Sequence, residues 1–162
     1  MKSDWSHIRL LVLDVDGVLT DGGMWFSRDG NESKRFCARD AHGLGKLRAA
    51  GIPVVLCSTG QSPITYGRAE KWDLDARWVG VKDKASAVLE IAAVYDVSLA
   101  DIAYIGDDEP DLAAFALVGF PIAVLDAEPS VLAAAHHVTN NNGGAGAVRE
   151  ICELILKQRV GA

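Results

Sequence analysis

Continuous apolar runs separated by helical patterns constrain the fold of this chain more than any other feature. The runs do not alternate between apolar and polar residues, which is typical of strands buried on both faces. Their alternation with helices predicts an α/β fold with a mostly parallel, doubly wound, Rossmann-like sheet. We expect strands at 8–14, 52–58, 76–79, 101–106 and 120–125, and helices at 41–50, 62–71, 84–95, 109–117, 128–135 and 146–158.

One segment, at about residues 22–39, interrupts this alternation. Asp29 and Gly30 lie there between two short arms, residues 24–26 and 34–36. An Asp-Gly step between β-prone arms predicts a hairpin. No repeat, low-complexity tract or linker divides the remaining sequence, so we expect residues 1–162 to form a single domain that carries a small hairpin insertion.

The acidic balance of the chain limits its partners. The formal net charge is −6 at pH 7 over 162 residues, whereas a nucleic-acid surface needs a basic stripe. The longest uncharged stretch, residues 112–125, is too short to span a membrane, and the N-terminus lacks a signal-peptide pattern. We therefore expect a cytoplasmic protein. Three cysteines that form no CxxC pair agree with a reducing compartment: Cys37, Cys57 and Cys152.

Two aspartates follow the first expected strand. Asp14 and Asp16 are two positions apart, so both point to the same side if the strand continues through them. Two carboxylates held together repel, so either one is protonated or a cation binds between them. An ordinary turn at Asp16 and Gly17 is an equally good interpretation of this short motif taken alone.

A second acidic cluster follows the expected strand at 101–106. It contains Asp107, Asp108 and Asp111, with Pro110 in the first turn of the next helix. Acidic residues at a helix start are also common caps, and capping is the simpler interpretation of Asp108. Ligands of open α/β sheets bind beyond the carboxyl ends of the strands, so the two acidic clusters would share one crevice. Their oxygen ligands suit Mg²⁺.

Hydroxyl and cationic groups follow two other elements. Ser58, Thr59 and Gly60 end the strand at 52–58, where they favour either an anion site at a helix start or an ordinary Ser/Thr cap. Lys84 opens a helix, where a cation opposes the helix dipole. An anionic substrate would explain its position, and a solvated surface is the alternative.

Taken in order, these motifs resemble a known family. DVDGVLTDG, the STG turn, Lys84 and GDDxxD are similar to the four successive motifs of the haloacid dehalogenase superfamily of phosphohydrolases. Over nearly the whole chain the sequence resembles the branch without a cap domain, which includes 3-deoxy-D-manno-octulosonate 8-phosphate and nonulosonate 9-phosphate phosphatases. The resemblance implies a Mg²⁺-dependent phosphomonoester hydrolase that acts through an aspartyl-phosphate.

The resemblance also implies a role for each motif residue. Asp14 matches the nucleophile and Asp16 the general acid and base. Mg²⁺ would be held by the Asp14 carboxylate, the Asp16 carbonyl and the Asp107 carboxylate. Thr59 matches a hydroxyl that bonds a phosphoryl oxygen, and Lys84 the cation that neutralises it. Two further acids would support the metal through water or hydrogen bonds: Asp108 and Asp111.

The residues expected to contact the phosphate or the rest of the substrate depart partly from the family pattern. Gln61 stands where octulosonate phosphatases usually carry arginine, and a neutral amide cannot pair with a sugar carboxylate as arginine does. The usual Arg-Asp-Gly-X-Gly appears as RDAHG, residues 39–43. The choice between octulosonate and nonulosonate substrates stays open. The expected contacts come from Gly60, Gln61, Arg39 and Arg68.

Relatives of this branch are tetramers in which a neighbouring subunit and its C-terminal tail complete the active site. The resemblance therefore implies a homotetramer acting on a small phosphate ester. The aromatic hairpin arm at 24–26 favours an interface independently, and the alternative is a hairpin that folds back on its own core. The tail at 157–162 is basic and flexible enough to reach a neighbour's anionic site. The alternative function is a non-catalytic or regulatory phosphatase-like module of sialic acid or sugar-nucleotide (cytidylyltransferase) metabolism.

Overall fold

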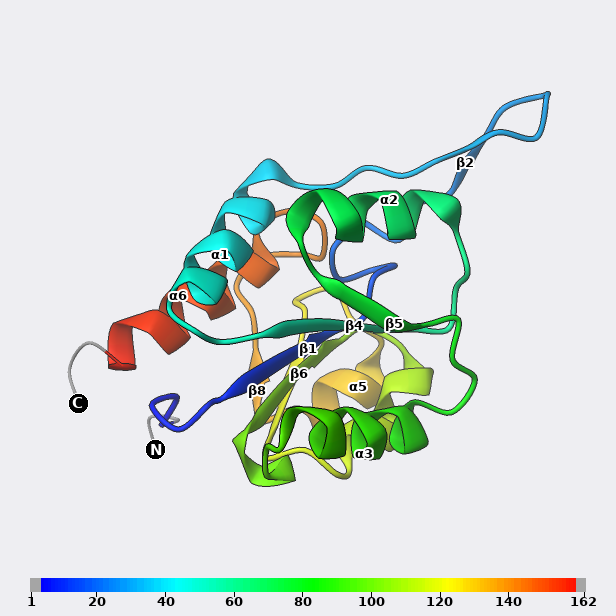
Figure 1. Cartoon of the computed structure of the whole chain (residues 1–162). Helices are drawn as coiled ribbons and strands as arrows, with labels where there is room; N and C mark the ends of the chain where they lie inside the picture. The colour runs from blue at the N-terminus through cyan, green and yellow to red at the C-terminus, as the bar shows by residue number, and fades with distance from the viewer. Residues whose placement is uncertain (1–3, 160–162) are drawn as a thin grey trace.

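The computed structural model describes residues 4–159, in which a six-stranded sheet is covered by helices on both faces (Figure 1). Its strands are β1 (Leu10–Leu13), β4 (Val54–Ser58), β5 (Asp75–Val79), β6 (Ile102–Gly106), β7 (Phe120–Ala123) and β8 (His137–Val138). They are ordered β5-β4-β1-β6-β7-β8, and every neighbouring pair is parallel. The predicted α/β architecture is confirmed.

The helices divide between the two faces because the chain changes direction once along the sheet. It runs from β1 outward through β4 to β5, then returns to β6 on the other side of β1. One face carries α1 (Ala38–Ala49), α2 (Pro63–Trp72) and α6 (Ala147–Arg159) (Figure 1). The other carries α3 (Lys84–Tyr95), α4 (Leu112–Phe115) and α5 (Pro129–Ala134) (Figure 1). The switch point, where such sheets bind ligands, therefore lies between β1 and β6.

The central strands form the core. All residues of β1, β4 and β6 are buried, because their continuous apolar runs face helices on both sides. Each buried Val, Leu or Ile side chain contributes about 1.5–3 kcal/mol relative to exposure. Within the described part of the chain, none of the helices combines the length and the apolar character needed to cross a lipid bilayer.

Several elements differ from the expectation. The short edge strand β8 was not among the expected strands, and β1 and β4 each begin two residues later than expected. Helix α1 begins at Ala38 instead of residue 41, directly after the extended Cys37. The helix expected at 109–117 is split into a 3₁₀ turn, η2 (Glu109–Asp111), and the short α4, because a capping box at Asp108 and Asp111 tightens the first turn. A second 3₁₀ turn, η1 (Leu99–Asp101), precedes β6.

The C-terminal tail expected at 157–162 is partly helical. Lys157 and Arg159 belong to the last turn of α6, where cations suit the helix dipole. Residues 160–162 lie outside the described residues. The expected helix at 146–158 already included residues 157 and 158, and the reach of the basic tail to a neighbouring subunit stays a prediction.

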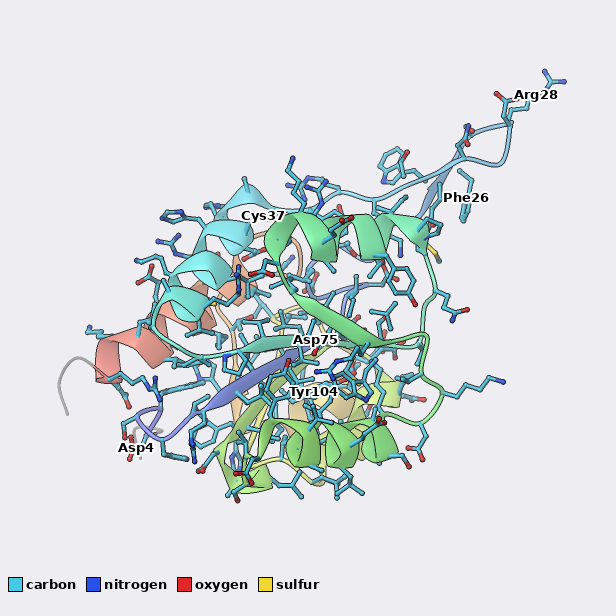
Figure 2. All side chains as sticks on the ribbon, in the orientation of Figure 1. Asp4, Phe26, Arg28, Cys37, Asp75 and Tyr104 are labelled. Carbon is cyan, nitrogen blue, oxygen red and sulfur yellow. The ribbon has the colours of Figure 1, made fainter. Side chains whose placement is uncertain are left out.

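The predicted hairpin is confirmed and projects from the body of the molecule (Figure 1). Its strands are β2 (Trp25–Phe26) and β3 (Glu32–Ser33), which pair antiparallel. The second arm lies at Glu32–Ser33 and not at 34–36, as expected from the sequence. Figure 2 shows Phe26 and Arg28 far out on this projection, whereas Tyr104 lies inside the body.

A glycine-rich segment packs against the loop after β1. A Cβ atom on Gly143 would overlap the carbonyl oxygen of Gly17, so the two backbones touch there. By contrast, a Cβ on Gly45, an exposed position of α1, meets nothing within 4 Å. A side chain therefore cannot be added at Gly143 without moving the backbone, whereas Gly45 has room for one.

We expect Gly143→Ala to lower the free energy of unfolding by about 1–3 kcal/mol, because the added methyl group forces two backbones apart. The control Gly45→Ala should raise it by about 0.4–1 kcal/mol, because it restricts the unfolded chain and suits the helix. Urea denaturation measures both. Equal effects of the two substitutions would contradict the packing described for Gly143.

Candidate active site

Three carboxylates meet where β1 and β6 end. One oxygen from each of Asp14, Asp107 and Asp111 lies within 4.8 Å of the others. The parallel register brings them together, because the Asp14 N–H donates to the Ile105 carbonyl at 3.0 Å. Gly17 allows the close approach: its φ is +87°, and a Cβ there would overlap the Asp107 carboxylate. The prediction that the two acidic clusters share one crevice is confirmed for these residues.

The Asp14 carboxylate is fixed from two sides. Its Oδ1 accepts the Val15 N–H at 2.7 Å, and its Oδ2 lies 2.9 Å from the Lys84 Nζ. The side chain is 13% exposed, so part of it faces solvent. Burial raises the pKa of Asp14 to about 6, although the Lys84 ammonium opposes this shift.

Lys84 is buried, so the solvated-surface interpretation is wrong. Its Nζ lies 2.5 Å from the Asp111 Oδ1 and bridges that residue to Asp14. Burial alone lowers the pKa of Lys84, but the charges of Asp14 and Asp111 raise it above the ordinary value. The unfavourable position of a cation at the start of α3 is offset by Asp83, whose carboxylate accepts the N–H groups of Ala85 and Ser86.

Asp111 is fully engaged by hydrogen bonds. Its Oδ1 also accepts the Tyr104 hydroxyl at 2.8 Å, and its Oδ2 accepts the N–H groups of Asp107 and Asp108 at 2.9 and 3.3 Å. Asp111 therefore orients Lys84 and closes the turn after β6, and it has little capacity left for a metal. The capping interpretation of Asp108 is confirmed, because its side chain accepts the Glu109 N–H.

Among the described residues, Asp107 is the carboxylate of this cluster that is left without a compensating partner. Its Oδ1 is buried and has no hydrogen-bond partner in the part of the chain that the structure describes. Burial, with the negative charges of Asp14 and Asp111, raises the pKa of Asp107 to about 8. A buried carboxylate oxygen without a partner is unfavourable, and a hard divalent cation satisfies it. Asp14 and Asp107 thus fit a Mg²⁺-type ion as its carboxylate ligands.

Asp16 is not one of the three clustered carboxylates, and the strand does not continue through it, although the expected pairing of Asp14 and Asp16 requires that. Strand β1 ends at Leu13, and the chain turns before Asp16. The Asp16 carboxylate instead faces Lys34, whose Nζ is 2.8 Å from each of its oxygens. The sequence analysis missed Lys34, because no local pattern links it to a partner 18 positions away.

The loop between β4 and α2 lies beside Asp16. A Cβ atom on Gly60 would be 3.3 Å from the Asp16 Oδ2, and the neighbouring Thr59 is exposed. Ser62 caps α2 by accepting the Ile64 N–H at 3.3 Å. The Gly60 N–H donates to the Ser58 hydroxyl oxygen at 3.3 Å. The helix cap is therefore Ser62, and the anion site at Thr59 and Gly60 stays a prediction.

The remaining expected substrate residues are engaged elsewhere. Gln61 is exposed and packs against Gly80, where a Cβ atom would overlap its side chain. The Arg39 guanidinium donates to the Ala145 carbonyl at 3.2 Å. The Arg68 guanidinium stacks on two rings, at 5.1 and 5.2 Å from the ring centres of Phe36 and Trp72. None of these contacts joins Arg39 or Arg68 to the carboxylate cluster.

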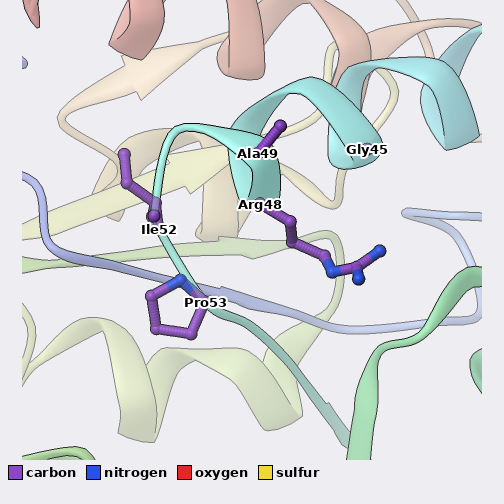
Figure 3. Close-up of a pocket in the computed structure, with 6 residues that line it drawn as sticks. Gly45, Arg48, Ala49, Ile52 and Pro53 are labelled. Atoms are coloured by element: carbon purple, nitrogen blue, oxygen red, sulfur yellow. The ribbon is translucent and has the colours of Figure 1, made fainter.

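A hollow of about 480 Å³ lies at the other end of the sheet (Figure 3). It is lined by the end of α1 and by residues that lead into β4, among them Arg48, Ile52 and Pro53. Because the carboxylate cluster lies at the carboxyl ends of the strands, this hollow is not part of it.

Comparison with known proteins agrees with this geometry. A sequence profile of the haloacid dehalogenase-like hydrolases matches residues 80–151. The chain is 40% identical over 151 residues to the 3-deoxy-D-manno-octulosonate 8-phosphate phosphatase KdsC of Yersinia pestis, covering 93% of this chain and 81% of that protein. The chain belongs to the haloacid dehalogenase-like hydrolases. Within that family, it is a phosphatase-type phosphoric monoester hydrolase.

Solved structures share the fold of this hydrolase over almost its full length. The octulosonate 8-phosphate phosphatase of Moraxella catarrhalis, in complex with magnesium, phosphate and KDO, superposes with a TM-score of 0.93 at 36% identity, covering 98% of this chain and 91% of that one. The cobalt-bound deoxy-D-mannose-octulosonate 8-phosphate phosphatase of Haemophilus influenzae gives a TM-score of 0.93 at 36% identity, covering 98% and 92%.

We expect the stability of the metal-free hydrolase to fall as pH rises from about 4 to about 8. The folded-state pKa values of Asp14 and Asp107, about 6 and about 8, exceed the ordinary value of 3.8. The folded state therefore binds more protons than the unfolded state in this range. Excess Mg²⁺ should raise the melting temperature more at about pH 8 than at about pH 5, because it competes with protons for the same carboxylates.

Melting curves in chelator and in Mg²⁺ at the two pH values measure this. In the control Asp107→Asn, the rise in melting temperature caused by Mg²⁺ should be nearly the same at the two pH values. A Mg²⁺ effect that is equal at both pH values would contradict the assignment of Asp107 as a ligand.

Proposed function

We propose that this hydrolase cleaves the phosphomonoester of a 2-keto-3-deoxy sugar acid, of octulosonate 8-phosphate or nonulosonate 9-phosphate type, through an aspartyl-phosphate on Asp14. The observation that carries the proposal is the Asp14 carboxylate, which is fixed by the Val15 N–H and Lys84 beside the unpartnered oxygen of Asp107. A carboxylate held in one orientation and partly open to solvent is suited to attack phosphorus in line.

The residues around Asp14 supply the other parts of the reaction. Asp14 attacks the phosphorus and the alcohol leaves, taking a proton from Asp16. Water then attacks the phosphorus of phosphorylated Asp14, which releases inorganic phosphate and restores the carboxylate. Lys84 neutralises charge on the transferring group, and the Thr59 hydroxyl bonds one of its oxygens. Mg²⁺ held by Asp14, Asp107 and the Asp16 carbonyl would offset the negative charge of the phosphate and the carboxylates.

The substrate class is proposed from two supports. The first is the likeness to phosphatases named for octulosonate 8-phosphate, one of them solved with phosphate and KDO. The second is Gln61, which is exposed directly after Thr59 and Gly60 and stands where octulosonate phosphatases usually carry arginine. A neutral amide at this position weakens selection for a carboxylate and therefore admits related sugar acids.

We expect Asp14→Asn to lower Mg²⁺-dependent phosphate release from p-nitrophenyl phosphate by about a thousandfold or more, because the amide cannot act as the nucleophile. The control Asp96→Asn removes the same charge at an exposed position with φ of +51°, which asparagine tolerates, and should keep wild-type activity. Equal activity of wild type and Asp14→Asn would overturn the role of Asp14.

A panel of octulosonate 8-phosphate, nonulosonate 9-phosphates and hexose phosphates tests the substrate class. We expect the highest kcat/KM for one of the two sugar acids. If no phosphate ester is turned over in Mg²⁺, the alternative of a non-catalytic or regulatory module replaces the enzyme proposal.

We also propose that the hydrolase is a homotetramer in which the hairpin contacts another subunit. Met24, Trp25 and Phe26 are 62%, 68% and 66% exposed on the projecting hairpin, an arrangement typical of an interface. Trp25→Glu should reduce the mass measured by light scattering from that of a tetramer to smaller species. Leu89→Glu changes another exposed apolar residue, on α3, and should leave the mass unchanged. An unchanged mass for Trp25→Glu would contradict the hairpin interface.

A further inference from the structure

We infer that Lys34, at the base of the hairpin, is a positioning residue that holds the Asp16 carboxylate for the attack of water on phosphorylated Asp14. This inference rests on the proposed function, because it concerns the second step of the same reaction. No feature of the sequence assigns Lys34 to the site, and its contacts in the folded chain carry the argument.

The geometry of the pair is that of a built contact. The Lys34 Nζ lies 2.8 Å from both Asp16 oxygens, so the ammonium sits astride the carboxylate. The Lys34 side chain is only 3% exposed, whereas Asp16 is 33% exposed. Surface lysines usually keep their ammonium group in water. The buried Lys34 therefore restricts the orientation of the Asp16 carboxylate. Because Asp16 is partly exposed, the carboxylate stays accessible to substrate.

A second carboxylate anchors Lys34 to the loop at residues 59–61, between β4 and the cap of α2, which is the proposed phosphate loop. The Glu32 Oε1 is 3.6 Å from the Lys34 Nζ, and the Glu32 Oε2 accepts the Ser62 hydroxyl at 2.7 Å. Ser62 caps α2, immediately after the loop that carries Thr59 and Gly60. The second arm of the hairpin thus links Asp16 on one side to the phosphate loop on the other, which keeps the two at a fixed spacing.

The step that depends most on this orientation is hydrolysis of the aspartyl-phosphate. The water oxygen forms a bond to phosphorus while the bond from phosphorus to the Asp14 oxygen breaks, and the electron pair of that bond returns to Asp14. One proton of the water passes to the Asp16 carboxylate, and inorganic phosphate leaves. Asp16 gave its proton to the leaving alcohol in the first step, so its carboxylate is free to accept this one. Its orientation toward the water is what Lys34 supplies.

Rapid-mixing kinetics with p-nitrophenyl phosphate tests the inference. Nitrophenolate is a good leaving group, so phosphorylation of Asp14 proceeds with little help from Asp16, whereas the hydrolysis step still needs it. We expect Lys34→Met to retain a burst of nitrophenolate while its steady-state rate per titrated active site falls by about 10- to 100-fold. Lys46→Met is the matched control, because it breaks an exposed ion pair between α1 and Glu153 of α6, and it should match wild type.

Normalising to the burst separates positioning from folding, since unfolded molecules contribute to neither the burst nor the steady state. Lys34→Arg keeps a cation and should recover most of the lost rate. If Lys34→Met is insoluble, Lys34→Gln takes its place in the same comparison. A steady-state rate per active site that equals wild type, or a burst rate that falls as much as the steady state, overturns the inference. Absence of Mg²⁺-dependent turnover in wild type overturns the proposed function instead.

Discussion

The buried Lys84 ammonium between Asp14 and Asp111 is the interaction on which the rest of the site depends. Three carboxylates converge where β1 and β6 end, and Lys84 bridges two of them. A buried ion pair is stable only if its geometry is good and its remaining hydrogen-bonding groups are satisfied. Tyr104 and two backbone N–H groups satisfy Asp111, and the Val15 N–H satisfies Asp14. This support fixes the orientation of Asp14.

One ammonium does not balance three carboxylates, and the imbalance falls on Asp107. Its buried oxygen has no partner within the described chain, and its pKa rises to about 8. The protein thus maintains a local excess of negative charge, which favours folding with a proton or with a divalent cation bound. The same excess explains why an acidic protein can act on an anionic phosphate ester, since a cation reverses the local field.

Much of the site was predictable because parallel α/β sheets place the ends of their strands together. Apolar runs ending in Asp14 and in Asp107 were enough to predict that these residues meet. Other features could not be predicted. A tyrosine inside an apolar strand, such as Tyr104, indicates that its hydroxyl has a hydrogen-bond partner in the core. The sequence does not identify that partner. The Asp16 contact with Lys34 also lacked a signal, because it depends on how the hairpin returns to the body.

The sequence by itself determined the alternation of helices with the five longer strands, the hairpin turn and the acidic residues at the strand ends, because hydrophobic periodicity and turn residues act locally. It did not indicate the two-residue edge strand β8. Only the tertiary structure decided which charges pair. It turned the chain after Leu13 and paired Asp16 with Lys34, and it buried Lys84 instead of exposing it. It also turned Arg68 onto the rings of Phe36 and Trp72. The strength of an interaction between two charges depends on the distance between them and on their burial. Both quantities are set by how segments far apart in the chain pack together, so they cannot be read from the sequence.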